Sequence, residues 1–124
     1  PAVDLLLQAG VETARRKSVA LTSYLIELFD EWLAPLGFTL GSPRESERRG
    51  SHVSIRHPEA YRINRALIEE MRVIPDFREP DNIRLGLAPL YTTFAEVHEA
   101  ARRIRAVVEE GWHLKYGVEK GVVT

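Results

Sequence analysis

The sequence predicts an α+β fold, a small and mostly antiparallel sheet with helices packed on one of its faces. Helical segments, in which apolar residues recur every three or four positions, alternate with pairs of short strand-like segments in the order α-β-β-α-β-β-α. Links of hairpin length join the strands of each pair. The 124 residues are 44% apolar and 28% charged, which fits one globular domain with its own core.

The first part of the chain is predicted to be helical. Residues 4–10 form one or two turns, with Gly10 as a stop or kink. The strongest helix signal runs over 12–33, and Pro35 and Gly37 end it. The first half of this helix is mostly polar, so we expect a solvated stalk that joins a second domain. Its second half carries an apolar stripe of Leu21, Tyr24, Leu25, Leu28, Phe29, Trp32 and Leu33.

The next segment predicts the first pair of strands. A short strand spans Phe38 to Leu40, and a polar loop rich in turn residues follows over 41–51. The second strand, at 51–56, alternates in polarity, with Val53 and Ile55 on one face. Its other face carries His52, Ser54 and Arg56.

A second helix is predicted over 57–71, with Pro58 at its first position. The second pair of strands covers 73–77 and 83–88, and Pro75 indicates that the first of them is an edge or irregular strand. The apolar side of the helix consists of Tyr61, Ile63, Leu67, Ile68 and Met71.

The last helix is predicted over 92–111, with Thr92 or Thr93 as N-cap and Glu96 in or near the first turn. The tail, 112–124, has no clear period, so we expect it to be loosely held. The buried side of the helix consists of Phe94, Val97, Ala101, Ile104 and Val108.

The composition excludes several functions. With 17 basic and 18 acidic side chains, the chain has no electrostatic footprint for nucleic acid or an anionic membrane. No apolar run approaches the roughly 20 residues of a membrane span. The absence of Cys rules out disulfides and thiolate chemistry and suits a cytoplasmic protein. The four histidines show no metal-ligand spacing, and no nucleophile or phosphate-binding motif occurs.

Arg84 stands out because it lies inside an otherwise apolar strand. Alternation places Arg84, Gly86 and Ala88 on one face, so the guanidinium has small neighbours and room in front of it. Two interpretations stay open: a structural ion pair with an acid of the preceding loop, or a site for a ligand carboxylate, which arginine grips with two parallel hydrogen bonds. The candidate acids are Asp76, Glu79 and Asp81.

Three blocks of the sequence resemble a known family: "SVALTSYLIELFDEWLAPLGF", "RGSHVSIRHPEAYRINRALIEEM" and "VIPDFREPDNIRLGLAPLYTTFAEV". They are similar to consecutive blocks of the C-terminal part of kynureninase, a fold-type I pyridoxal-phosphate enzyme of the class V aminotransferase group. The resemblance covers roughly Asp4 to Arg105 in order, and its most specific part is "PDFREPDNIRLGLAPLYTTF".

The resemblance implies a small C-terminal domain that closes over a large domain absent from this chain. Residues 1–35 would be linking helices, 36–110 the small domain and 111–124 a tail. Arg84 matches the family's arginine for the substrate's α-carboxylate. The implied reaction is hydrolysis of L-kynurenine, or 3-hydroxykynurenine, to anthranilate, or 3-hydroxyanthranilate, and L-alanine in tryptophan catabolism.

The cofactor machinery departs from this pattern. The family's Schiff-base lysine belongs to the large domain, and Lys17, Lys115 and Lys120 do not sit in a matching context. We therefore expect pyridoxal phosphate to be bound by the large domain, no catalytic residue in this chain, no activity of the chain alone, and a homodimer at full length. The alternatives are the small domain of another enzyme of the group, and a stand-alone α+β module that binds a small acid or a protein.

Overall fold

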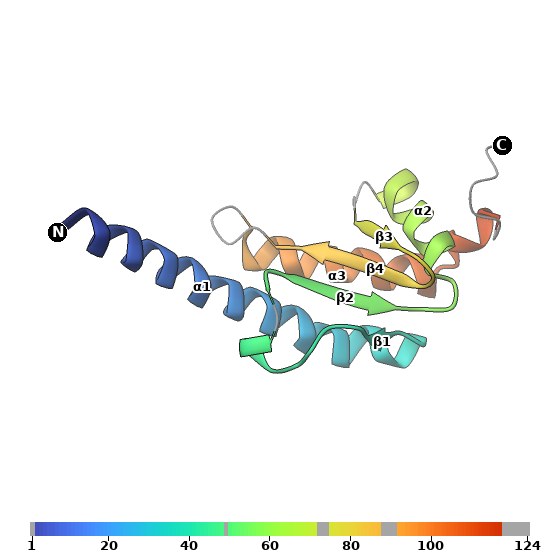
Figure 1. Ribbon diagram of the computed structural model, residues 1–124. Helices are drawn as coiled ribbons and strands as arrows, with labels where there is room; N and C mark the ends of the chain where they lie inside the picture. Colours follow the sequence, from blue (N-terminus) through green and yellow to red (C-terminus); the bar gives the residue numbers. More distant parts are fainter. Residues whose placement is uncertain (1, 49, 72–74, 88–91, 118–124) are drawn as a thin grey trace.

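The computed structural model describes residues 2–48, 50–71, 75–87 and 92–117 (Figure 1). Within this part of the chain, helices and strands follow one another in the predicted order. They are α1 (Ala2–Leu28), β1 (Thr39–Leu40), β2 (His52–Arg56), α2 (Ala60–Met71), β3 (Asp76–Arg78), β4 (Asn82–Gly86) and α3 (Phe94–Glu109). Short helical turns lie between and after them: η1 (Phe29–Leu33), η2 (Ala34–Leu36), η3 (Ser46–Arg48) and η4 (Trp112–Lys115).

The strands form one antiparallel sheet in the order β1-β2-β4-β3. The central strands β2 and β4 are not consecutive, so their pairing joins segments about 30 residues apart, with Val53 opposite Leu85 and Ser54 opposite Arg84. β3 lies at an edge and begins directly after Pro75, as the proline predicts. Residues 73 and 74, expected in this strand, lie outside the described residues. The predicted α+β class is confirmed.

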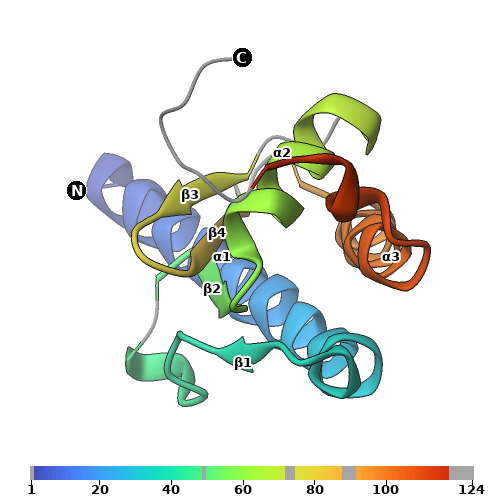
Figure 2. The same ribbon diagram turned by 90° about the vertical axis from the view of Figure 1, so that its right-hand side faces the viewer.

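The core lies between the sheet and the helices. Val53, Ile55 and Ile83 on the central strands are fully buried, and burial of each such side chain stabilises the fold by roughly 1.5–3 kcal/mol. α2 and α3 contact each other on the same side of the strands (Figure 2). The helices contribute further buried residues, chiefly Leu21, Leu25, Phe29, Leu33, Ile63, Leu67, Val97, Ala101, Ile104 and Val107.

The prediction that Gly10 stops or kinks the first helix is wrong. α1 runs without a break from Ala2 to Leu28, and helical turns continue to Leu36. A single glycine in a helix costs roughly 0.5–1 kcal/mol relative to alanine, too little to end a helix flanked by good helix formers. The run ends where the sequence predicts, at Gly37, which takes φ 97° and donates its N–H to the carbonyl of Ala34 at 3.1 Å.

The start of α3 decides between the two predicted caps. Thr93 is the N-cap, and its hydroxyl accepts a hydrogen bond from the N–H of Glu96 at 3.1 Å. The Glu96 carboxylate in turn accepts the N–H of Thr93 at 2.9 Å, which completes a capping box. Both donors would otherwise lack a partner at the helix end, so this pair fixes where α3 begins.

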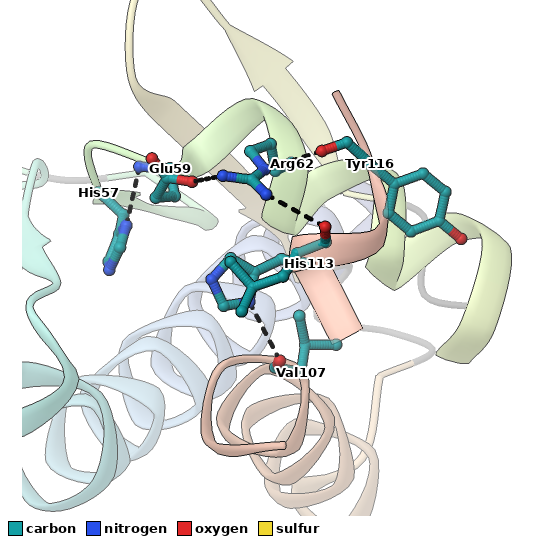
Figure 3. A network of polar contacts seen from close by, with 7 residues as sticks. His57, Glu59, Arg62, Val107, His113 and Tyr116 are labelled. Carbon is teal, nitrogen blue, oxygen red and sulfur yellow. Dashed lines mark hydrogen bonds and ion pairs between the residues drawn. The ribbon is translucent and has the colours of Figure 1, made fainter. Parts of the chain in front are cut away.

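The segment after α3 is not loosely held as far as residue 117. η4 packs on α2, where Arg62 donates hydrogen bonds to the carbonyls of Tyr116 at 2.8 Å and Leu114 at 3.2 Å (Figure 3). Glu59 pairs with the same guanidinium at 2.5 Å, and His113, within η4, is buried. The expectation of a loose tail is therefore wrong for 112–117, because a distant arginine hydrogen-bonds two backbone carbonyls of this segment. The rest of the tail lies outside the described residues.

Candidate functional site

The candidate site is the open face of the sheet, which we define as the side turned away from the helices. Every second residue of a strand points to this side, and the antiparallel register aligns these residues in rows across β2, β4 and β3. The open face carries His52, Ser54, Arg56, Asp76, Arg78, Asn82, Arg84 and Gly86.

The predicted alternation along β4 is confirmed. Ile83 and Leu85 are buried at 0% and 6% exposure, whereas the Arg84 side chain between them is 35% exposed. Gly86 shares its face with Arg84 and is exposed. Ala88, the third residue expected on this face, lies outside the described residues. Arg84 thus keeps its charge at the surface while its strand neighbours fill the core.

Space is open beside Arg84. A methyl group placed on Gly86 would meet no atom within 4 Å among the described residues. The glycine is exposed, and its backbone does not take the left-handed conformation that would itself require glycine. A side chain at this position would project from the face on which a ligand of Arg84 would lie. The small size of Gly86 therefore leaves the guanidinium accessible from one side.

The structural ion pair considered for Arg84 is present only as a long contact with Asp76. Asp76 lies directly opposite Arg84 in the register with β3, and its Oδ2 is 3.5 Å from Nη2 of the arginine. The same oxygen accepts shorter contacts from Arg78, 3.0 Å from Nε and 2.8 Å from Nη2. Arg78 is thus the main partner of Asp76. An exposed pair of this kind contributes about 0–1 kcal/mol.

The arrangement around Arg84 suits a carboxylate ligand. A guanidinium has five N–H donors in a planar fork, and in the described part of the chain its polar contact is with Asp76 alone, at Nη2. A carboxylate binds with both oxygens along one of two edges of the fork, Nε with Nη2 or Nη1 with Nη2. Both edges include Nη2, so such a ligand of Arg84 would have to displace or share the long contact with Asp76. Ser54, directly across the β2–β4 ladder, adds a hydroxyl to the same face.

The sequence identified the neighbours of Arg84 only in part. Ser54 was expected on a polar face, but the sequence does not say that β2 pairs with β4, since the two strands are separated by a helix and another strand. Asp76 was one of three acids considered, and strand register selected it. Counting back through the β3–β4 hairpin could have found Asp76, whereas no local signal indicates Ser54.

The histidines behave as structural residues. The imidazole of His57 accepts the N–H of Glu59 at Nδ1, 2.9 Å away, and its Nε2 is 3.1 Å from the carbonyl of Leu36. Burial of the ring holds the pKa of His57 below its ordinary value of 6.5, against the hydrogen bond to Leu36. In the described part of the chain, no three metal-binding side chains gather.

Comparison with known proteins identifies the family. The model of the kynureninase C-terminal domain matches residues 14–104. A kynureninase of Geobacillus thermodenitrificans is 39% identical over 98% of this chain, one of Pseudomonas fluorescens is 45% identical over 86%, and one of Shouchella clausii is 43% identical over 96%. This chain belongs to the kynureninase C-terminal domain family.

The kynureninase C-terminal domain match includes the whole sheet and the residues around Arg84. The matched regions make up 28%, 26% and 27% of the lengths of those three relatives, so the chain spans just over a quarter of each. None of the helices in the described residues is long and apolar enough to cross a membrane.

Proposed function

We propose that this chain is the C-terminal part of a pyridoxal-phosphate-dependent kynureninase and that Arg84 binds the α-carboxylate of the substrate. The parent enzyme would hydrolyse L-kynurenine or 3-hydroxykynurenine to L-alanine and anthranilate or 3-hydroxyanthranilate. One observation carries this proposal. The arginine that the family resemblance assigns to the carboxylate stands on the open face. Among the described residues its polar contact is with Asp76 alone, and a methyl group on Gly86 would meet no atom within 4 Å.

Arg84 would act by orientation. Two hydrogen bonds to the α-carboxylate fix the rotation about the substrate's Cα, so that the bond to be broken is held in the reactive geometry. A charged hydrogen bond of this kind is worth roughly 1.5–3 kcal/mol. Pyridoxal phosphate, when bound, supplies the electron sink for the cleavage.

We assign no cofactor site to the residues of this chain that the structure describes. Of the described lysines, Lys17 lies on α1 and Lys115 stacks its ammonium over the ring of Trp112, 4.4 Å from the centroid. Neither belongs to the open face. Lys120 lies outside the described residues. The proposal therefore assigns the cofactor to the large domain, and the chain alone would be inactive.

The large domain would also be the partner of α1. The first half of this helix extends away from the sheet and the other helices (Figure 1). Leu7 and Val11, four positions apart and so on one side of the helix, are 65% and 69% exposed. Apolar side chains exposed in this way are expected to pack on another surface. We assign residues 1–35 to the link and 36–110 to the small domain of a cytoplasmic homodimer.

The activity test uses the full-length enzyme with pyridoxal phosphate. We expect release of anthranilate from L-kynurenine, and we expect Arg84→Ala to lower kcat/KM by roughly 10- to 100-fold, the loss of one charged carboxylate contact. Arg56→Ala is the matched control, because it removes the same charge from the same face. If Arg84→Ala kept wild-type kcat/KM, Arg84 would not be the carboxylate ligand.

The same assay separates the alternative enzymes. A transaminase or desulfurase of the same group would also use an arginine for the carboxylate, but it would release no anthranilate from kynurenine. If the full-length enzyme releases anthranilate and Arg84→Ala leaves kcat/KM unchanged, the kynureninase function is retained and only the role of Arg84 is rejected.

A further inference from the structure

Three charged side chains of the β3–β4 hairpin form a chain of contacts on the open face. Arg78 contacts Oδ2 of Asp76 from Nη2 at 2.8 Å and from Nε at 3.0 Å. Arg84 reaches the same oxygen only at 3.5 Å. Asp76 and Arg78 are two positions apart on one strand and so share a face, and Asp76 lies opposite Arg84 in the register.

The position of Asp76 matters because its carboxylate can compete with a substrate carboxylate for Arg84. Side chains directly opposite in an antiparallel pair have Cβ atoms about 4.5–5.5 Å apart, close enough for an aspartate and an arginine to form a short ion pair. A carboxylate in that position would occupy the donors that a substrate carboxylate needs. At 3.5 Å, Asp76 and Arg84 do not form a short ion pair.

Arg78 accounts for the open pair. Its guanidinium makes the two short contacts to Oδ2 of Asp76, the same oxygen that Arg84 reaches only at 3.5 Å. It also supplies a positive charge that offsets the carboxylate. Arg84 keeps Nε and Nη1 without a partner among the residues that the structure describes.

We propose that Arg78 is a positioning residue that holds the Asp76 carboxylate away from Arg84 and thereby keeps Arg84 available to the α-carboxylate of the amino-acid substrate. The inference rests on the proposed function of Arg84. It assigns Arg78 no contact with the substrate. Removal of Arg78 releases Asp76 to close on Arg84, and the substrate must then displace an internal carboxylate.

The other arginine of this face provides a control. Arg56 donates from Nε to the side-chain oxygen of Asn82 at 3.2 Å and makes no contact with Asp76 in the described structure. Arg56→Gln and Arg78→Gln therefore remove equal charge from the same face, and only the second frees Asp76. A general electrostatic attraction of the substrate would respond to both substitutions alike.

The test measures KM and kcat for L-kynurenine in the full-length enzyme with pyridoxal phosphate. For Arg78→Gln we expect KM to rise about three- to tenfold, while kcat stays within about twofold of the wild-type value. The expected rise in KM corresponds to the energy of a surface ion pair that the substrate must displace. Asp76→Asn combined with Arg78→Gln should return KM to within about twofold of wild type, since the competitor is then neutral. Arg56→Gln should leave KM within about twofold of wild type.

Two results would overturn the inference: wild-type KM in Arg78→Gln, or a double variant as impaired as Arg78→Gln alone. A merely structural role of Arg78 predicts the second result, because neutralising Asp76 would not repair the strand. Arg84→Ala separates this inference from the proposed function. If Arg84→Ala lowers kcat/KM and Arg78→Gln leaves KM unchanged, only the role of Arg78 fails. If neither variant changes kcat/KM, the role of Arg84 fails as well.

Discussion

The two faces of the β2–β4 ladder are built from alternating residues of the same strands, yet one face is buried in the core and the other is open to solvent. On the covered face, Val53, Ile55 and Ile83 are fully buried against the helices. On the open face, Ser54 and Arg84 lie side by side across the ladder with part of their surface in solvent. One residue of displacement along a strand separates a side chain that stabilises the domain from one available to a ligand.

The difference shows why a charge is tolerated inside an apolar strand. Arg84 is flanked in sequence by two core residues, but its side chain never enters the core. The cost of burying a charge is avoided, and the strand backbone still fixes where the guanidinium begins. A rigid strand of this kind holds a ligand-binding group more precisely than a loop does.

The largest effect is expected from the covered face. Ile83→Ala removes a fully buried side chain from the central strand and should lower the free energy of unfolding by about 2–5 kcal/mol. Urea unfolding of the 124-residue chain, followed by circular dichroism, measures this change. Arg84→Ala, one position along, should change stability by no more than about 0.5 kcal/mol. Equal losses for both variants would contradict the division between the faces.

The next effect tests the open face through geometry rather than charge. Arg84→Lys keeps the positive charge but loses the planar fork, so we expect kcat/KM of the full-length enzyme to fall by about tenfold, or 1.4 kcal/mol. Stability should stay within about 0.5 kcal/mol of wild type. Activity equal to that of the wild type would mean that a point charge suffices and that two parallel hydrogen bonds are not required.

His57 lies just after β2, where the chain leaves the sheet for α2, and it should make stability depend on pH. Its pKa is lowered in the folded state mainly by burial; Glu59 acts in the opposite direction, and His113 lowers it further. The unfolded chain therefore binds the proton more readily. This contribution to stability is complete above about pH 6.5 and declines as the pH falls below it, by at most about 1.4 kcal/mol per pH unit.

His57→Asn tests this dependence. The asparagine oxygen can still accept the N–H of Glu59 as an N-cap, while the contact with Leu36 is lost. We expect the variant to be about 1 kcal/mol less stable at pH 8, and to lose less stability than the wild type between pH 7 and pH 5. Unfolding free energies across that range provide the measurement. Parallel pH curves would show that His57 does not carry the effect.

The smallest effect concerns the space beside Arg84. A methyl group at Gly86 meets no atom of the described residues within 4 Å, so Gly86→Ala should raise stability by about 0.4–1 kcal/mol through the unfolded chain. If the substrate uses this space, KM should rise at least about twofold at the same time. Gly117→Ala, whose added methyl also meets no atom of the described residues within 4 Å, is the control and should leave KM unchanged. An unchanged KM in both variants would place the substrate elsewhere on the open face.

Much of the fold follows from local patterns. Period-two alternation predicted which face of β4 carries Arg84, and the capping residues predicted the start of α3 to within one position. The misses have a shared cause. The effect of Gly10 was overestimated, because a local penalty of about 1 kcal/mol is too small to interrupt an otherwise continuous helix. The ordered turn η4 was not predicted, because Arg62, which donates hydrogen bonds to the carbonyls of this segment, lies more than 50 positions away.

The sequence by itself determined the class of the fold, the inward and outward sides of each main strand, and the position of Arg84 on the outward side of an otherwise apolar strand. Those features depend on helix and strand periods, which are local. Only the tertiary structure decided that β4 pairs with both β2 and β3, and so which side chains surround Arg84. Strand pairing between distant segments depends on how the whole core packs, and no local period carries that information.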